Sequence, residues 1–225
     1  MLDIWHINLD QDVMSLPQVL DDEEQARAEN FHFEHHRRRF IVSHIATRLI
    51  LASYTALGPA ELLFKYNAYG KPFLAIHNPL LFNISHTEEM ALCAVSDVAE
   101  LGVDIEKTQP INYYEVAKRF FSAKECELLA NLAPNLQQEG FFCCWTRKEA
   151  YIKAKGLGLS LPLDQFSVSL TPGNPATLLS SEFDPEDVSR FRIVNIEVAK
   201  GYKAALAYSS LTQQDPVHYQ WMVGK

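Results

Sequence analysis

Hydrophobic positions in the first half of the chain predict one long helix among several strands. Residues 2–9 are strand-like. Between about residues 36 and 57 apolar side chains recur at helical spacing until Gly58-Pro59 ends the pattern, which predicts the helix. Short apolar runs separated by turn residues then predict strands at 62–65, 73–76, 81–85, 91–95 and 101–106.

The second half repeats this order of helix followed by strands. Helices are predicted after Pro110, from a capping box at residues 122–125, and from about 137 to 155. Strands are predicted at 165–170, 191–198 and 202–207. The recurrence predicts an α+β fold of two similar α+β halves, residues 1–107 and 108–225, each with antiparallel strands packed on helices.

Composition and charge limit the classes to which this protein can belong and the ligands that it can bind. The chain has 225 residues, of which 48% are hydrophobic, and 20 Lys+Arg against 28 Asp+Glu give a net charge of −8. This charge disfavours general nucleic-acid binding, so any anion must meet a local group of cations. Because no apolar run could span a bilayer and no signal peptide is evident, we expect a cytoplasmic protein without a membrane partner. The cysteine spacing disfavours zinc and indicates reduced thiols.

Two carboxylates on one strand are the strongest chemical signal. In the segment 102–106, side chains alternate between faces, so Asp104 and Glu106 point the same way while Val103 and Ile105 enter the core. Adjacent carboxylates are the kind of oxygen ligands that Mg²⁺ takes together with substrate phosphates. The alternative is an edge strand with a solvated polar face.

A second signal lies on the predicted helix that ends at residue 155. Glu149 and Lys153 are four residues apart and therefore share one helix face. If the two residues are functional, Glu149 would be a third metal ligand or a base, and Lys153 would be a cation that binds phosphate oxygens. If their role is only structural, the two residues would form a common surface ion pair.

Three weaker signals are cationic or polar. Ser85 and His86 at a strand end could bind a phosphate or simply form a turn. Arg48 borders the apolar stripe of the first long helix, either as a functional cation or as a rim residue that reaches solvent, and the acidic run 21–24 is expected to face solvent. The turn formed by Tyr69, Gly70, Lys71 and Pro72 could lie against a nucleotide.

Taken together, these segments resemble the 4′-phosphopantetheinyl transferase superfamily, Sfp type, the monomeric kind built from two similar halves. The resemblance implies a pseudo-two-fold arrangement with the site between the halves, and a cleft completed by one chain. It spans most of the sequence and rests on motifs that occur in the family order. These motifs are residues 69–72, 82–86, 102–107, 117–122, 145–153 and 158–163.

The resemblance implies an activity and its components. The enzyme would transfer the 4′-phosphopantetheine moiety of coenzyme A to a serine hydroxyl of an acyl or peptidyl carrier protein and release adenosine 3′,5′-bisphosphate. Mg²⁺ would be the metal, with Mn²⁺ as a substitute. One alternative is a metal-dependent hydrolase of coenzyme A or a nucleotide, which would need no carrier. Another is a scaffold without catalysis, which the complete set of carboxylates and Lys153 disfavours.

The resemblance also assigns roles to residues. Asp104, Glu106 and Glu149 would hold the metal, Glu149 would act as base directly or through a water, and Lys153 would stabilise the leaving bisphosphate. Coenzyme A would be bound by Arg48, Tyr69, Gly70, Lys71, Pro72, Ser85, His86, Asp104 and Lys153.

An apolar and basic segment offers a surface for the carrier protein. Phe120 and Phe121 lie next to Lys118, Arg119 and Lys124, a combination that suits an acidic helical partner with an apolar patch. The alternative is that both Phe side chains belong to the core.

Overall fold

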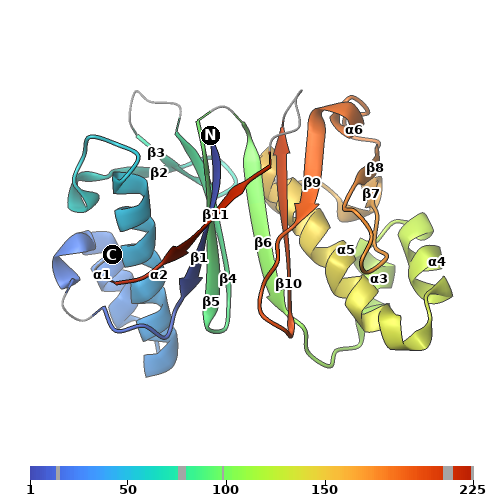
Figure 1. Cartoon of the computed structure of the whole chain (residues 1–225), viewed down its shortest axis with the longest axis horizontal. Helices are drawn as coiled ribbons and strands as arrows, with labels where there is room; N and C mark the ends of the chain where they lie inside the picture. Colours follow the sequence, from blue (N-terminus) through green and yellow to red (C-terminus); the bar gives the residue numbers. More distant parts are fainter. Residues whose placement is uncertain (14–15, 76–79, 98, 210–214, 224–225) are drawn as a thin grey trace.

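The computed structural model describes residues 1–13, 16–75, 80–97, 99–209 and 215–223. Two sheets stand side by side, with α2 outside the first and α5 outside the second (Figure 1). The helices are α1 (Asp22–Glu29), α2 (Glu34–Ala52), α3 (Tyr113–Phe120), α4 (Ala123–Asn131), α5 (Pro134–Lys155) and α6 (Asp187–Arg190). The strands are β1 (Leu2–Asn8), β2 (Phe64–Tyr66), β3 (Pro72–Leu74), β4 (Leu81–Thr87), β5 (Met90–Ser96), β6 (Leu101–Lys107), β7 (Phe166–Val168), β8 (Leu178–Ser181), β9 (Phe191–Asn195), β10 (Tyr202–Ser209) and β11 (Val217–Trp221).

Most strands pair antiparallel. The first sheet has the order β11-β1-β5-β4 and the second has the order β6-β10-β9. β2 pairs with β3 and β7 with β8 as separate two-stranded ribbons. The pairing of β1 with β11 is parallel, and every other recorded pairing is antiparallel. The predicted α+β class, with antiparallel strands packed on helices, is therefore confirmed.

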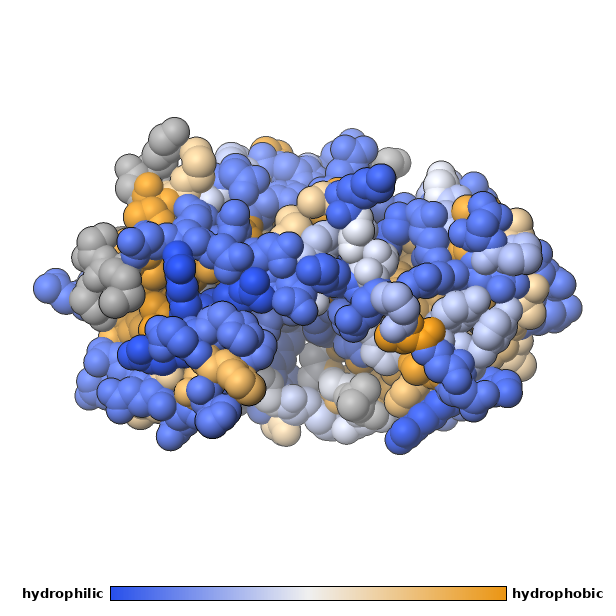
Figure 2. All heavy atoms as spheres, turned by 90° about the horizontal axis from the view of Figure 1, so that it is seen from below, coloured by the Kyte–Doolittle hydropathy of each residue, from blue (hydrophilic) through white to orange (hydrophobic). Residues whose placement is uncertain are grey.

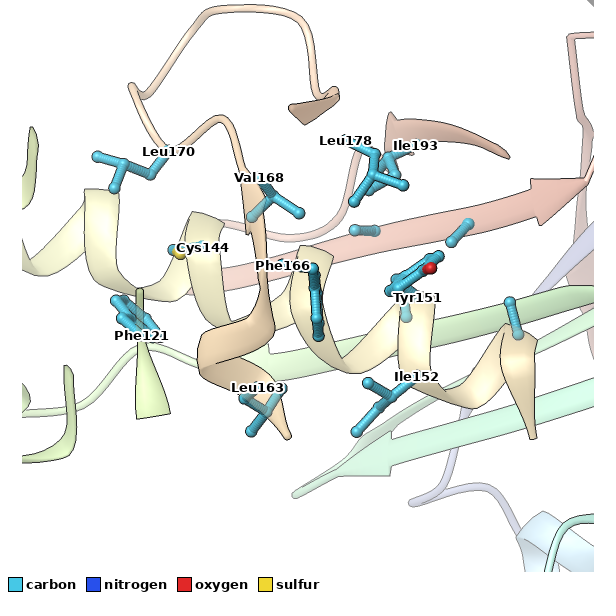
Figure 3. Packing of buried hydrophobic residues seen from close by; sticks show 14 of the residues in the cluster. Phe121, Cys144, Tyr151, Ile152, Leu163, Phe166, Val168, Leu170, Leu178 and Ile193 are labelled. Carbon is cyan, nitrogen blue, oxygen red and sulfur yellow. The ribbon is translucent and has the colours of Figure 1, made fainter. Parts of the chain in front are cut away.

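Three apolar cores hold the layers together. The first fills the space between α2 and the first sheet, with side chains such as Ile45 and Cys93. The second lies between α5 and the strands of the second half, where Tyr151 packs near Phe166 (Figure 3). The third joins the two sheets, and Val103 and Ile105 of β6 point into it as the alternation predicts. Each sheet is thus covered on both faces.

Element boundaries differ from the prediction by a few residues. The strand predicted at 73–76 is β3, which ends at Leu74, and residue 76 lies outside the described residues. The strand predicted at 165–170 is shorter, since β7 ends at Val168, where its register with β8 shifts. None of the helices in the described ranges is long and apolar enough to cross a membrane. Seen from below, the surface is mostly hydrophilic, with apolar side chains in small separate groups (Figure 2).

The sheets do not divide at the predicted boundary of residues 107 and 108. β6 precedes that boundary but pairs with β10 of the second half, and β11 returns from the end of the chain to pair with β1. β6 joins the second sheet because both of its faces are buried by neighbouring elements. One face packs into the core between the sheets, and the other lies against α5.

Gly102 allows α5 to lie directly on β6. A Cβ at this position would stand 2.2 Å from the carbonyl oxygen of Ala150 and 2.2 Å from the amide nitrogen of Ala154. Both are helix backbone atoms, so a side chain cannot be accommodated by a rotamer change. The absence of a side chain at Gly102 therefore sets the distance between the strand and the helix that carry the candidate site.

We expect Gly102→Ala to push α5 away from β6 and to lower the free energy of unfolding by about 3 kcal/mol or more, the upper part of the range for overpacking. Urea denaturation measures the change. Gly58→Ala is the matched control, because its new Cβ would meet only the flexible Glu61 side chain, at 3.0 Å. Equal stability of Gly102→Ala and the wild type would contradict this account of the contact.

Candidate active site

Three side chains lie on the face of α5 that is turned toward β6. Trp145, Glu149 and Lys153 follow one another at intervals of four residues, so they form a stripe along the helix. All three are half-buried, whereas most of their neighbours on α5 are buried. Asp104 and Glu106 lie on the facing strand. The i, i+4 spacing therefore brings the helix residues of the candidate site to the same place as the strand carboxylates.

Lys153 binds the strand and not its helical neighbour. Its Nζ donates to Oδ1 of Asp104 at 2.6 Å and to Oγ of Ser85 at 3.0 Å. Ser85 Oγ in turn donates to the same Asp104 oxygen at 2.9 Å. The ion pairs recorded for the described residues include Lys153 with Asp104 and none with Glu149. The interpretation of Glu149 and Lys153 as a surface ion pair is therefore wrong.

Asp104 is buried, with 3% of its surface exposed. The solvated-face alternative for β6 is therefore wrong as well. While Oδ1 has two donors, Oδ2 is buried and no partner within the described residues reaches it. A buried carboxylate oxygen without a donor is costly, and it leaves one coordination position for a cation.

The pKa of both glutamates at the site is raised, in part by the charge of Asp104. Burial and then the Asp104 charge raise the pKa of Glu149 to about 7. Burial and then Asp104 also raise the pKa of Glu106. A divalent cation would relieve this repulsion, and oxygen-only donors suit Mg²⁺. The chemistry of these donors therefore suits a divalent cation, although no group of three His, Cys, Asp or Glu side chains within the described residues is arranged to hold a metal ion.

Asn83 and Ser85 join the two sheets at the site. Asn83 Oδ1 accepts the Val103 N–H at 2.8 Å, and Ser85 Oγ accepts the Ile105 N–H at 3.3 Å. These side chains satisfy β6 amides along the edge where β4 and β6 meet without a backbone ladder. Ser85 and His86 lie within β4, which extends the predicted strand to Thr87, so the turn alternative is wrong and phosphate binding stays a prediction.

His86 lines a cavity of about 230 Å³. Desolvation of its ring and then the charge of Lys153 lower the pKa of His86. Pro72, His44 and Glu24 line the same cavity, and His44 Nδ1 lies 2.7 Å from Glu24 Oε1. Sequence reasoning missed His44 and Glu24. The helical spacing of His44 from Arg48 was the available signal, since it places both on adjacent turns of α2.

Arg48 is a buried structural cation. It is fully buried, its Nε donates to Glu24 at 2.7 Å, and Nη2 pairs with Asp21. Nη1 donates to the carbonyl oxygens of Pro59 and Leu62. The rim interpretation is wrong, and so is the expectation that the whole acidic run faces solvent, because Glu24 is buried. In this conformation Arg48 presents no exposed donor to coenzyme A, so that contact stays a prediction.

The turn at residues 69–72 is held against α5 and β6. Asn67 caps it by accepting the N–H groups of Tyr69 and Lys71, and Gly70 takes a left-handed φ of 83° that favours glycine. Lys71 Nζ donates to the carbonyl oxygens of Leu101 at 2.9 Å and Ala154 at 3.3 Å. Its ammonium therefore points at protein carbonyls, while Tyr69 is exposed.

We expect the stability of the protein to rise with pH between about 8 and 10.5 because of Lys71. Burial lowers the pKa of Lys71 from 10.5 to about 8. In that interval the unfolded chain binds the proton more tightly, so folding gains up to about 1.4 kcal/mol per pH unit. Urea unfolding of the wild type and Lys71→Met across this range measures the effect. Parallel stability curves for the two proteins would contradict it.

The predicted carrier surface is only partly exposed. Phe121 is buried and stacks on Phe141 with ring centroids 5.3 Å apart, so its assignment to a surface is wrong. Phe120 is half-buried and packs edge-on against Trp145. Lys124 is exposed at the start of α4. The alternation of Phe120 and Phe121 between surface and core follows from the end of α3 between them.

Models of known protein families match both parts of the chain. A family model described as the 4′-phosphopantetheinyl transferase superfamily matches residues 100–207, and one described as 4′-phosphopantetheinyl transferase, N-terminal, matches residues 5–98. The two matches meet just before β6. This division agrees with the sheet to which β6 belongs.

Individual relatives point the same way. The 4′-phosphopantetheinyl transferase HetI of Nostoc sp. is 41% identical over 182 residues, 78% of this chain and 76% of that protein. The 4′-phosphopantetheinyl transferase Sfp of Bacillus subtilis is 34% identical over 187 residues, 83% of this chain and 81% of that protein. The crystal structure of Thermotoga maritima holo-[acyl-carrier-protein] synthase is 18% identical, covers 49% of this chain and 62% of that chain, and has a TM-score of 0.40, too low to support an argument. The chain belongs to the 4′-phosphopantetheinyl transferase superfamily and is an enzyme of the Sfp type.

Proposed function

We propose that this enzyme transfers 4′-phosphopantetheine from coenzyme A to a serine hydroxyl of an acyl or peptidyl carrier protein in the presence of Mg²⁺. The observation that carries the proposal is the group of carboxylates and Lys153 where β4, β6 and α5 meet. Coenzyme A contains a pyrophosphate and a 3′-phosphate, which require both a cation and basic side chains. The site offers Asp104 with a free buried oxygen and, beside it, the ammonium of Lys153.

The carboxylates would hold the divalent cation. Asp104, Glu106 and Glu149 would be its ligands, with Mn²⁺ as a substitute for Mg²⁺. When bound, such a cation supplies Lewis-acid stabilisation for the pyrophosphate and a template for its orientation. Lys153 would neutralise the charge that develops on the leaving phosphate. Ser85 fixes Asp104 and Lys153 relative to each other through its two short contacts.

Glu149 would act as the general base. Its carboxylate would take the proton of the serine hydroxyl; without a cation, burial and the Asp104 charge raise its pKa to about 7. The serine oxygen would form the new bond to the phosphorus next to the pantetheine arm. The bond from that phosphorus to the bridging pyrophosphate oxygen would break, and adenosine 3′,5′-bisphosphate would leave with the electron pair.

The nucleotide part of coenzyme A would lie between the turn at residues 69–72 and His86. Pro72 and His86 line one cavity, which supports their placement on the two sides of the ligand. Tyr69, Gly70 and Lys71 would contribute backbone and side-chain surface around the adenine. Phosphate binding would favour the protonated form of His86. Arg48 would support this region through its contact with the carboxylate of Glu24, which lines the same cavity.

Intact-mass spectrometry of an apo carrier protein tests the reaction. After incubation with this enzyme, coenzyme A and Mg²⁺, we expect the carrier to gain the mass of one phosphopantetheine, and EDTA to prevent the gain. A hydrolase would instead release free phosphopantetheine in the absence of a carrier. That outcome, or unmodified carriers from fatty-acid, polyketide and peptide synthesis, would overturn the proposal.

The part of the predicted carrier surface that is not buried gives a separate prediction. We expect Phe120→Ala or Lys124→Glu to raise KM for the carrier protein by about fivefold to tenfold, since each removes one interface contact worth about 1–1.4 kcal/mol. KM for coenzyme A should stay unchanged in Lys124→Glu, whose side chain is exposed. Phe121→Leu is the comparison within the segment, because its side chain is buried and should affect stability before it affects KM. Unchanged KM for the carrier in both surface variants would contradict this assignment.

A further inference from the structure

Two histidine side chains meet where the last strand of the chain joins the first. Nε2 of His6 on β1 lies 3.0 Å from Nδ1 of His218 on β11, and the ring centroids are 5.3 Å apart. This is the distance of a hydrogen bond between two ring nitrogens, so one nitrogen donates its N–H and the other accepts. The contact therefore requires that one of these two nitrogens carries no proton.

Few other contacts hold β11 in place. It lies at the edge of the first sheet, and among the described strands it pairs with β1 alone. Four of its five residues are exposed, and Trp221 is the one that is buried. Tyr219 stacks on Trp5 of β1, with ring centroids 4.7 Å apart. A strand with so little buried surface opens at a low free energy, so the loss of one contact changes its open population measurably.

The surroundings of the histidine pair do not offset a second positive charge. Both histidines line an open groove of about 870 Å³, to which both sheets contribute. The other titratable side chains of this lining are Glu89, Glu197, Tyr202 and Tyr219. The two phenols are neutral at acid pH, Glu197 is exposed, and Glu89 already pairs with Lys107 at 3.7 Å. Burial and then the charge of His218 lower the pKa of His6, so the pair resists its second proton.

We propose that a second proton on the His6–His218 pair weakens the attachment of β11 to β1, which makes this strand an acid-sensitive element of the fold. With one added proton, a nitrogen is still available to accept the hydrogen bond. The second proton places two N–H groups and two positive charges against each other across 3.0 Å. Because the pKa of His6 is lowered from 6.5 in the folded protein, the stability that the pair contributes is present above that pH and is lost as the pH falls below it. Opening of β11 leaves the edge of β1 unpaired.

Amide hydrogen exchange of β11, expressed as protection relative to the intrinsic rate at each pH, tests the inference. From about pH 7.5 to about pH 5 we expect the protection of β11 in the wild type to fall about tenfold or more relative to that of β5, because a hydrogen bond is replaced by a repulsion. His218→Gln keeps a polar side chain that takes up no proton, so its protection should stay constant. His35→Gln is the matched control, because it removes an exposed histidine that also contacts another histidine, His36, but lies on α2. It should behave as the wild type does.

Constant protection of β11 in the wild type would overturn the inference, as would the same loss of protection in His218→Gln. A second measurement does not depend on the folding of a variant. In the wild type, the ring-proton NMR signals of His6 and His218 should titrate as a coupled pair, with the second proton taken up below pH 6.5 and together with the loss of β11 protection. Independent titration of both rings near pH 6.5, with β11 still protected, would overturn the inference.

Discussion

Asp104→Ala is expected to reduce kcat for phosphopantetheine transfer by roughly a thousandfold or more. The carboxylate is proposed as a cation ligand, and it holds Lys153 at 2.6 Å. Its removal would cost the cation site one of its three proposed carboxylate ligands and would leave the Lys153 ammonium without its counter-charge. Metal stabilisation of a transferring phosphoryl group amounts to several kcal/mol, and about 1.4 kcal/mol corresponds to tenfold in rate. Single-turnover transfer to an apo carrier at saturating Mg²⁺ measures the loss.

The stability of the Asp104 variant separates chemistry from folding. Replacement of Asp104 also removes a buried oxygen that has no hydrogen-bond donor, so part of the lost ion pair is offset. Ser85→Ala is the matched comparison: it removes the hydroxyl that bonds both Asp104 and Lys153 but leaves both charges in place. We expect a much smaller fall in kcat for Ser85→Ala. Transfer by Asp104→Ala at a rate within tenfold of the wild type would contradict the assignment of Asp104 to the cation.

Local patterns in the sequence were sufficient to predict the relative positions of site residues that lie on the same helix or strand. Strand alternation placed Asp104 and Glu106 on the same side, and helical spacing placed Glu149 and Lys153 together. The capping box at Ser122 and Glu125 is present as predicted. Each of these relations depends on a repeat of two or about four residues, which the backbone geometry fixes wherever the element forms.

Contacts between segments far apart in the sequence could not be predicted from local patterns. The pairing of β11 with β1 joins residues more than 200 positions apart, and no local signal indicates that partner. Arg48 was placed beside an apolar stripe, but its burial depends on Glu24 of another helix. Lys153 has a helical neighbour at the favourable spacing, and it binds Asp104 because β6 lies directly beneath α5 at Gly102. Tertiary packing decided each of these cases.

Glu149→Gln is expected to lower kcat by about 10²–10⁴, the contribution of a general base, while the protein stays folded. The substitution keeps the size of the side chain and removes its negative charge. It also removes a group that burial and the Asp104 charge disfavour in its ionised form, so the free energy of unfolding should not fall. Rapid-quench measurement of a single turnover at saturating coenzyme A and carrier gives the chemical rate separately from substrate binding.

The pH profile distinguishes a base from a ligand that acts only through its charge. The pKa of Glu149 without a cation is about 7, so the ionised form that can take a proton is lost as the pH falls below that value. Wild-type transfer should therefore decrease toward acid pH, and a higher Mg²⁺ concentration should move the decrease to lower pH, because a bound cation favours the carboxylate. Glu149→Gln should retain a low rate that does not follow this profile. A variant with the wild-type pH dependence and nearly the wild-type rate would exclude Glu149 as the base, and another acceptor for the serine proton would then have to be sought among the groups around Asp104.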